Sequence, residues 1–136
     1  MASAKIMIVE DNTTVAEDCC DCLVNLGYDV VSIVASGEEA VARAEEKRPD
    51  AVVMDVHLRD KMDGIEAAEQ IYSRFKIPVV FLSAYSDCEL LDRAKRVGSF
   101  GYMLKPFKEC ELAAMLEMAL YRVKTDRARR QMEDRL

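Results

Sequence analysis

Residues 51–54 form a run of four apolar side chains, and the run ends directly in the carboxylate of Asp55. A run this short and this apolar, preceded by Pro49 and Asp50, is typical of a strand buried on both faces, as in a parallel sheet. Open α/β sheets bind their ligands outside the carboxyl ends of the strands. We therefore expect Asp55 at the ligand-binding edge of such a sheet.

Four further apolar runs have the same character, and predicted helices separate all five. The predicted strands are residues 5–9, 30–35, 51–54, 79–82 and 101–104. The predicted helices start after the capping residues 12–14 and end near 26, then cover 38–47, 64–75, about 87–97 and the residues from about 108.

This alternation requires right-handed crossovers and a parallel sheet with helices on both faces. The predicted fold is α/β, a doubly wound, flavodoxin-like sheet of five parallel strands with five flanking helices. The strand order 2-1-3-4-5 is one of two common doubly wound orders and is the one we adopt, although the spacing alone does not select it.

Composition limits the function classes. The chain has 136 residues, 51% hydrophobic and 32% charged, as expected for one ordinary globular domain. Its net charge of -6 argues against direct binding to nucleic acid or to an anionic membrane surface. No apolar run approaches the roughly 20 residues of a membrane span, and residues 1–5 are too few for a signal peptide. A cytoplasmic location is expected.

Three of the five cysteines cluster at Cys19, Cys20 and Cys22, which gives a C-x-x-C spacing. A redox or zinc site would need a second ligand pair or a position at the start of a helix. The cluster instead falls in the middle of a predicted helix, and the chain has one histidine. We interpret these cysteines as small, half-buried side chains in a reducing compartment.

Polar residues follow four of the predicted strands. Glu10 and Asp11 follow the first, Asp55 the third, Ser83 the fourth and Lys105 the fifth. With strands one and three adjacent, three carboxylates meet at one edge. Two such charges 4 Å apart repel by about 4 kcal/mol at an effective dielectric constant near 20, so compensating positive charge is required.

Lys105 can neutralise one of these charges, and a divalent cation can neutralise two more. An all-oxygen ligand set suits Mg²⁺, which also binds phosphate oxygens, and does not suit metals that prefer thiolate or imidazole. Asp55 is then the best nucleophile for phosphoryl transfer, because a carboxylate can form an aspartyl-phosphate. Lys105 and the metal would balance the phosphoryl charge, and Ser83 could donate a hydrogen bond.

These residues, taken together, resemble the receiver domain of two-component response regulators over residues 5 to about 121. The matching positions are Glu10-Asp11, Asp55, Met62-Asp63-Gly64, Ser83-Ala84, Tyr102 and Lys105-Pro106. The resemblance implies a phosphorylation-activated signalling switch that accepts a phosphoryl group from a histidine kinase or phosphotransfer domain. It implies no enzyme activity beyond the domain's own phosphorylation and dephosphorylation.

The resemblance also implies roles for individual residues. Asp55 matches the phosphoacceptor and Lys105 the phosphate-binding lysine. The Mg²⁺ ligands would be Glu10, Asp11, Asp55 and the backbone carbonyl of His57. Glu10 departs from the family pattern, because aspartate is commoner there and Glu10 is one methylene longer.

The resemblance further identifies Ser83 and Tyr102 as a switch pair. In the phosphorylated state the hydroxyl of Ser83 would move inward, and the ring of Tyr102 would follow into the vacated space. The peptide bond before Pro106 is a candidate for the cis form.

The last stretch differs from the rest of the chain. Residues 122–136 are rich in charge, lack Gly and Pro, and continue the helical pattern. We divide the chain into a receiver domain, residues 1–121, and a charged helical extension or linker, residues 122–136. A solvated helix, a coiled-coil stub and a linker to further domains are all open, and the chain could be the N-terminal receiver of a longer sensor or hybrid kinase. A homodimer could form through this helix or through the face formed by the fourth helix, fifth strand and fifth helix.

The sequence also bears on three other functions. An aspartyl-phosphate enzyme of the phosphatase type typically has a second acid two residues after the nucleophile, where this chain has His57. A nucleotide-binding module would carry G-x-G-x-x-G after the first strand, which is absent. A phosphorylation-independent interaction domain is disfavoured because every chemical position is filled.

Overall fold

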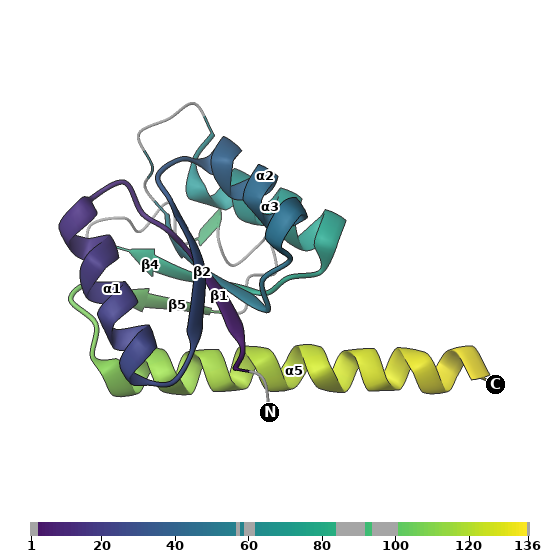
Figure 1. The fold of residues 1–136 in the computed structure, drawn as a ribbon. Coiled ribbons are helices and arrows are strands. Elements are labelled where there is room, and N and C mark those ends of the chain that lie inside the picture. The colour runs from purple at the N-terminus through teal and green to yellow at the C-terminus, as the bar shows by residue number, and fades with distance from the viewer. Residues whose placement is uncertain (1–2, 57, 59–61, 84–91, 94–100, 136) are drawn as a thin grey trace.

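The computed structural model describes residues 3–56, 58, 62–83, 92–93 and 101–135. Its elements are β1 (Lys5–Val9), α1 (Thr13–Asn25), β2 (Asp29–Val34), α2 (Gly37–Lys47), β3 (Ala51–Asp55), α3 (Gly64–Phe75), β4 (Val79–Ser83), β5 (Gly101–Leu104) and α5 (Glu109–Arg135). The strands form one parallel sheet in the order β2-β1-β3-β4-β5 (Figure 1). The predicted fold class and strand order are therefore confirmed. Of the fourth helix predicted at residues 87–97, all but residues 92–93 lie outside the described residues.

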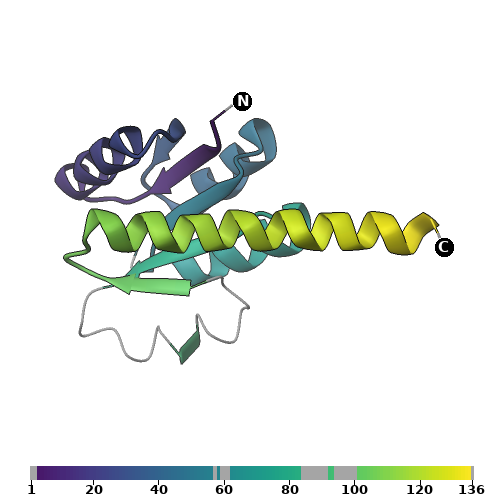
Figure 2. The same ribbon diagram turned by 90° about the horizontal axis from the view of Figure 1, so that it is seen from below.

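Helices cover both faces of the sheet. α2 and α3 lie on one face, and α1 and α5 lie on the other (Figures 1 and 2). Successive side chains of a strand point to opposite faces. In β1, Met7 and Val9 pack in the core beneath α2 and α3, whereas Ile6 and Ile8 pack in the core beneath α1 and α5. Apart from their end residues Lys5, Asp55 and Ser83, the central strands are apolar because both faces are buried.

Three helices start directly beyond the carboxyl edge of the sheet, each with a polar side chain as its N-cap. The Oδ1 atom of Asn12 accepts a hydrogen bond from the backbone N–H of Val15 at 3.2 Å. Ser36 and Asp63 cap α2 and α3 in the same way. Each cap satisfies a backbone donor that the first turn would leave unpaired, so the chain can turn from strand to helix within a few residues of the edge.

α5 is the longest element and crosses the domain boundary predicted at residue 121 without a break. At 1.5 Å per residue its 27 residues span about 40 Å. Its first part packs on the sheet through Leu112, Leu116 and Ala119, and its end extends past the domain (Figure 2). The division into residues 1–121 and 122–136 stays a prediction. Among the described residues, no helix is both long and apolar enough to cross a membrane.

The cysteine cluster lies on α1. Cys19 is buried in the core, and Cys20 and Cys22 are half-buried against it. Burial is the main cause that raises the pKa of the Cys19 thiol to about 12, so this thiol stays protonated at neutral pH. Such a thiol is a poor nucleophile and a poor metal ligand, which agrees with a packing role.

Candidate functional site

The pairing of β1 with β3 brings the acidic residues together. Val9 lies opposite Met54 in this parallel pair, so Glu10 and Asp55 follow at the same edge of the sheet. One carboxylate oxygen from each of Glu10, Asp11 and Asp55 lies within 4.8 Å of the other two. The predicted convergence of three acids is therefore present. Among the described residues this is the only group of three or more potential ligand side chains that converges.

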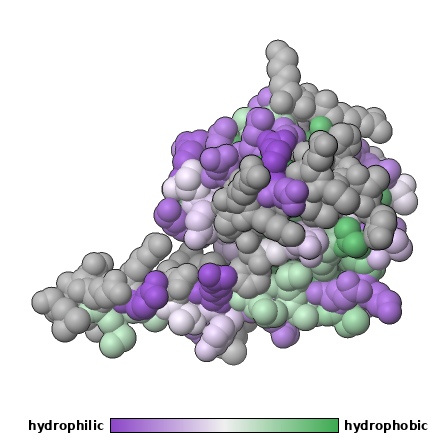
Figure 3. All heavy atoms as spheres, turned by 180° about the vertical axis from the view of Figure 1, so that it is seen from behind, coloured by the Kyte–Doolittle hydropathy of each residue, from purple (hydrophilic) through white to green (hydrophobic). Residues whose placement is uncertain are grey.

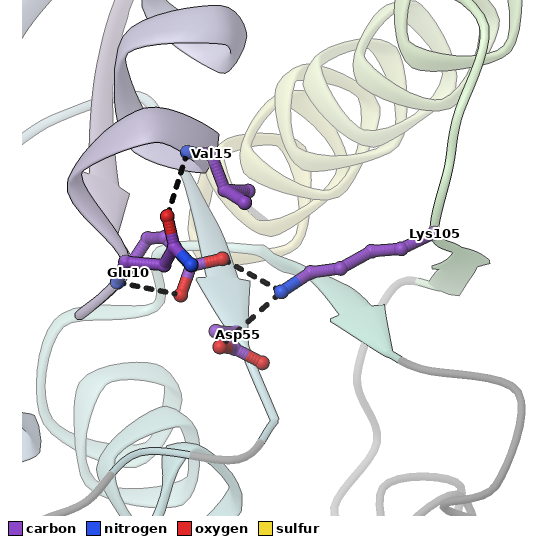
Figure 4. Close-up of polar contacts among 5 residues, drawn as sticks. Glu10, Val15, Asp55 and Lys105 are labelled. Atoms are coloured by element: carbon purple, nitrogen blue, oxygen red, sulfur yellow. Dashed lines mark hydrogen bonds and ion pairs between the residues drawn. The ribbon is translucent and has the colours of Figure 1, made fainter.

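Lys105 reaches this group from the end of β5, an outer strand of the sheet. Ser83 lies opposite Leu104 in the β4–β5 pair, and the backbone N–H of Lys105 donates to the carbonyl of Ser83 at 2.8 Å. The Lys105 side chain then extends across the edge (Figure 4). Its Nζ lies 2.7 Å from Oε1 of Glu10 and 3.4 Å from Oδ2 of Asp55. The lysine thus bridges Glu10, which follows β1, and Asp55, the last residue of β3.

The two acids that contact Lys105 are nearly inaccessible to solvent. The side chain of Glu10 is 1% exposed and that of Asp55 is 8% exposed, compared with 26% for Lys105. Asp11 is half-buried at the rim. Electrostatic interactions in such a place are screened less than those on the surface, so the balance of charge matters strongly here.

Burial and the neighbouring carboxylate of Asp55 raise the pKa of Glu10, and Lys105 only partly opposes this. Burial by itself lowers the pKa of Lys105, but its hydrogen bond to Glu10 and the charge of Asp55 outweigh burial, so the pKa of Lys105 is raised. These are the shifts expected where carboxylates outnumber the cation that pairs with them.

The donor set fits a hard divalent cation. All three side chains offer carboxylate oxygens, two of them are buried, and their spacing allows one ion to contact all three. Mg²⁺ is bound in proteins by such oxygens and retains waters and phosphate oxygens as further ligands. The fourth predicted ligand, the backbone carbonyl of His57, lies outside the described residues.

Gly64 holds the start of α3 against the backbone of Asp55. A Cβ atom at Gly64 would overlap the carbonyl oxygen of Asp55, and the N–H of Gly64 donates to the carbonyl of Val56 at 3.2 Å. The adjacent Asp63 caps α3 and also forms an ion pair with Arg93 at 2.8 Å. The sequence identified Asp63 and Gly64 as matching positions without giving them a role. The contact of Arg93 was missed, because no local pattern links residues 30 positions apart.

Ser83 and Tyr102 occupy opposite environments. Ser83 is fully buried at the carboxyl end of β4, one residue after the position that pairs with Asp55. Tyr102 lies on β5 with 36% of its surface exposed. The peptide bond between Lys105 and Pro106 is cis.

A doubly wound sheet with an acidic cluster and a lysine at its carboxyl edge is the architecture of phosphoacceptor signalling domains. Residues 6–117 match the model of the response regulator receiver domain. The chain belongs to this family, whose members serve phosphorylation-dependent two-component signalling. The receiver resemblance identified in the sequence is therefore confirmed.

Two solved structures are close in fold. The signal receiver domain of a modulated diguanylate cyclase from Desulfovibrio desulfuricans G20 is 36% identical, with a TM-score of 0.88 over 92% of this chain and 99% of that one. The receiver domain of the sensor histidine kinase PA1611 from Pseudomonas aeruginosa PAO1 is 33% identical, with a TM-score of 0.79 over 88% of this chain and 98% of that one. That second structure has a magnesium ion coordinated in its active-site cleft.

A curated relative is the transcriptional regulatory protein PdtaR of Mycobacterium tuberculosis. It is 37% identical over 118 residues, which cover 87% of this chain and 57% of PdtaR. The chain thus spans little more than half the length of this relative. The family match shows a signalling domain over residues 6–117. The match to PdtaR covers a stretch of similar length, 118 residues.

Proposed function

We propose that Asp55 accepts a phosphoryl group from a histidine kinase or phosphotransfer domain, and that its phosphorylation activates this chain as a signalling switch. The observation that carries the proposal is the position of Lys105, whose ammonium group bridges Glu10 and Asp55 inside a buried cluster of three carboxylates. A lysine placed in this way is available to the phosphoryl oxygens of a modified Asp55.

In the proposed step, a carboxylate oxygen of Asp55 attacks the phosphorus atom of a phosphohistidine. The new O–P bond forms as the P–N bond breaks, and the ring nitrogen keeps the electron pair. The ammonium group of Lys105 is placed to balance the negative charge on the phosphoryl oxygens. Hydrolysis of the acyl phosphate returns the Asp55 carboxylate and releases inorganic phosphate.

The metal ligands in this proposal are Glu10, Asp11, Asp55 and the carbonyl of His57. When bound, Mg²⁺ would supply positive charge that offsets the repulsion among the carboxylates and the phosphoryl oxygens. The β1–β3 pair holds Glu10 and Asp55 close to each other, and this arrangement supports their assignment as ligands.

Ser83 and Tyr102 provide the proposed readout. The hydroxyl of Ser83 lies at the same edge as Asp55 and could donate a hydrogen bond to a phosphoryl oxygen. The ring of Tyr102 would then move from its exposed position on β5 toward the space that the hydroxyl leaves. The result is a shift between two conformations whose populations phosphorylation changes.

Several broader properties belong to this proposal. The partner is a histidine kinase or phosphotransfer domain in the cytoplasm, and the chain itself does not bind nucleic acid directly. The chain also forms homodimers. Of the two surfaces predicted for a dimer, the one that includes the fourth helix involves residues outside those described, whereas α5 is described from Glu109 to Arg135.

The test uses acetyl phosphate and Mg²⁺ as a small-molecule phosphoryl donor system, with intact-mass spectrometry as the readout. The wild-type chain should gain the mass of one phosphoryl group, and the gain should disappear when Mg²⁺ is chelated. Asp55→Asn has nearly the same shape and should gain nothing. Glu69→Gln, an exposed position on α3, should behave as the wild type. An Asp55→Asn variant that is still phosphorylated would refute the assignment.

A further inference from the structure

α5 carries two faces with different roles. Leu112, Leu116 and Ala119 are buried against the sheet. Ala114, Met118 and Tyr121 each lie two residues after one of these buried residues. In a helix of 3.6 residues per turn, two residues correspond to about 200°, so this second set lies on the opposite side of α5. This second set faces away from the domain and continues past its end. We call it the outer stripe, and it consists of Ala114, Met118, Tyr121, Thr125, Ala128 and Met132.

Every member of the outer stripe is exposed. The three large members, Met118, Tyr121 and Met132, are 61%, 72% and 69% exposed. Figure 3 shows the end of α5 standing clear of the domain, with hydrophobic surface beside hydrophilic side chains. An isolated helix that is exposed on all sides gains nothing from apolar side chains in a row, so their alignment points to a partner.

The spacing identifies the kind of partner. Neighbours along the outer stripe are four, three, four, three and four residues apart. This is the 3.5-residue repeat of coiled-coil core positions, in which Met118, Thr125 and Met132 take one core position and Ala114, Tyr121 and Ala128 the other. A helix with this repeat packs against a second helix that has the same repeat, and a second copy of this chain supplies one.

Charges beside the outer stripe favour one orientation. In a parallel pair in register, the residue before one core position lies beside a residue five places later on the other helix. Glu117 then meets the partner's Arg122 in an attractive contact, whereas Lys124 meets the partner's Arg129 in a repulsive one. In the antiparallel pair that aligns all six core positions, centred midway between Tyr121 and Thr125, Lys124 meets the partner's Lys124. The flanking contacts of that pair contain no pair of opposite charge. The parallel arrangement alone gains an attractive contact.

We propose that the outer stripe is the seam of a parallel, in-register coiled-coil homodimer. The seam begins at Ala114 and Met118, where α5 is still anchored to the sheet, so dimerisation fixes two receiver domains side by side. The proposal does not depend on the phosphoacceptor chemistry. It adds to the expected homodimer a defined surface, an orientation and a register.

The experiment is sedimentation equilibrium of the 1–136 chain across a concentration series at physiological salt. The wild type should approach twice the chain mass of 15.4 kDa. Tyr121→Glu buries a charge in the seam and should raise the dimer Kd by about a hundredfold or more. Val24→Glu is the matched control, because Val24 is 57% exposed on α1 outside the outer stripe, and it should leave the Kd unchanged.

Lys124→Glu tests the orientation. In the parallel dimer it converts two repulsive contacts with the partner's Arg129 into attractive ones, and the Kd should fall about tenfold. In the antiparallel pair it places glutamate beside glutamate and gains no attractive contact. An unchanged or raised Kd for Lys124→Glu, a monomer at every concentration, a trimer mass, or equal effects of Tyr121→Glu and Val24→Glu would overturn the proposal. Asp55→Asn should dimerise as the wild type, so failure here is distinct from failure of the phosphoacceptor assignment.

Discussion

Glu10 is the least exposed of the carboxylates that contact Lys105. It donates no hydrogen bond when ionised, and its second oxygen accepts from the backbone N–H of Asn12 at 3.3 Å. The raised pKa of Glu10, caused first by burial and then by Asp55, means that its charged form is less stable in the folded protein than in the unfolded chain. The residue is therefore suited to binding a cation at some expense of stability.

Glu10→Gln should stabilise the domain at pH 7 when EDTA is present, because it removes a buried negative charge that lies beside the carboxylate of Asp55. A carboxyl group whose pKa is raised on folding binds more protons in the folded state. Wild-type stability should therefore fall as the pH rises from about 4.5 through the raised pKa of Glu10 and stay lower above it. The gain from Glu10→Gln should be present at pH 7 and shrink toward pH 4.

Urea unfolding at these two pH values measures the effect, and the exposed Glu69→Gln serves as the control. With Mg²⁺ in place of EDTA the order should reverse, because the variant has lost a metal ligand. If Glu10→Gln lowered stability in EDTA at pH 7, the explanation that burial and repulsion from Asp55 destabilise the ionised Glu10 would be wrong.

At the scale of elements, the contact between α3 and β3 sets the position of Asp55. Gly64→Ala would place a methyl group on the carbonyl oxygen of Asp55, and the nearest atoms are backbone atoms of Asp55 and Val56, which cannot move aside as the end of a flexible side chain can. We expect a loss of about 1–3 kcal/mol in the free energy of unfolding and slower phosphorylation by acetyl phosphate.

Gly101→Ala is the matched comparison. The nearest atoms there are the Sδ and Cε of Met115, at the end of a flexible side chain that can move aside. Its loss should be smaller, and phosphorylation should be unaffected. Equal losses in the two variants, measured by urea unfolding, would show that the Gly64 contact has no special role.

The elements themselves could be predicted largely from local pattern. The central strands β1, β3 and β4 were recognisable because both of their faces are buried, which makes their runs almost wholly apolar. The edge strands β2 and β5 are only partly buried, but each is still a mostly apolar run. Gly27, with a φ of 91°, ends α1 as expected. Strand ends were less accurate: β3 includes Asp55 and β4 includes Ser83, since both polar residues still pair within the sheet. The strand order depends on contacts between distant segments, which local spacing does not encode.

The sequence predicts which residues form the site better than it predicts the contacts between them. That Glu10, Asp11, Asp55 and Lys105 meet follows from strand ends at one edge. Three features do not follow from local sequence: the shorter distance from Lys105 to Glu10 than to Asp55, the packing of Gly64 on Asp55, and the ion pair of Asp63 with Arg93. Each depends on side-chain packing between elements that are far apart in the chain.

At the scale of the whole molecule, charge is distributed unevenly. Residues 122–136 contain six basic and three acidic residues, whereas the complete chain has a net charge of -6. At low salt this extension would be attracted to acidic surfaces in general, and screening limits that attraction at physiological ionic strength. Measurements of dimerisation are therefore informative at physiological salt, where the outer stripe rather than net charge decides association.

The central claim is that the carboxyl edge of the sheet directs phosphorylation to one residue. After reaction with acetyl phosphate and Mg²⁺, reduction with borohydride converts an aspartyl-phosphate into homoserine, and peptide mass spectrometry locates the change. We predict homoserine at position 55 alone. Homoserine at position 11 or elsewhere, or a chain that remains unmodified, would contradict the account.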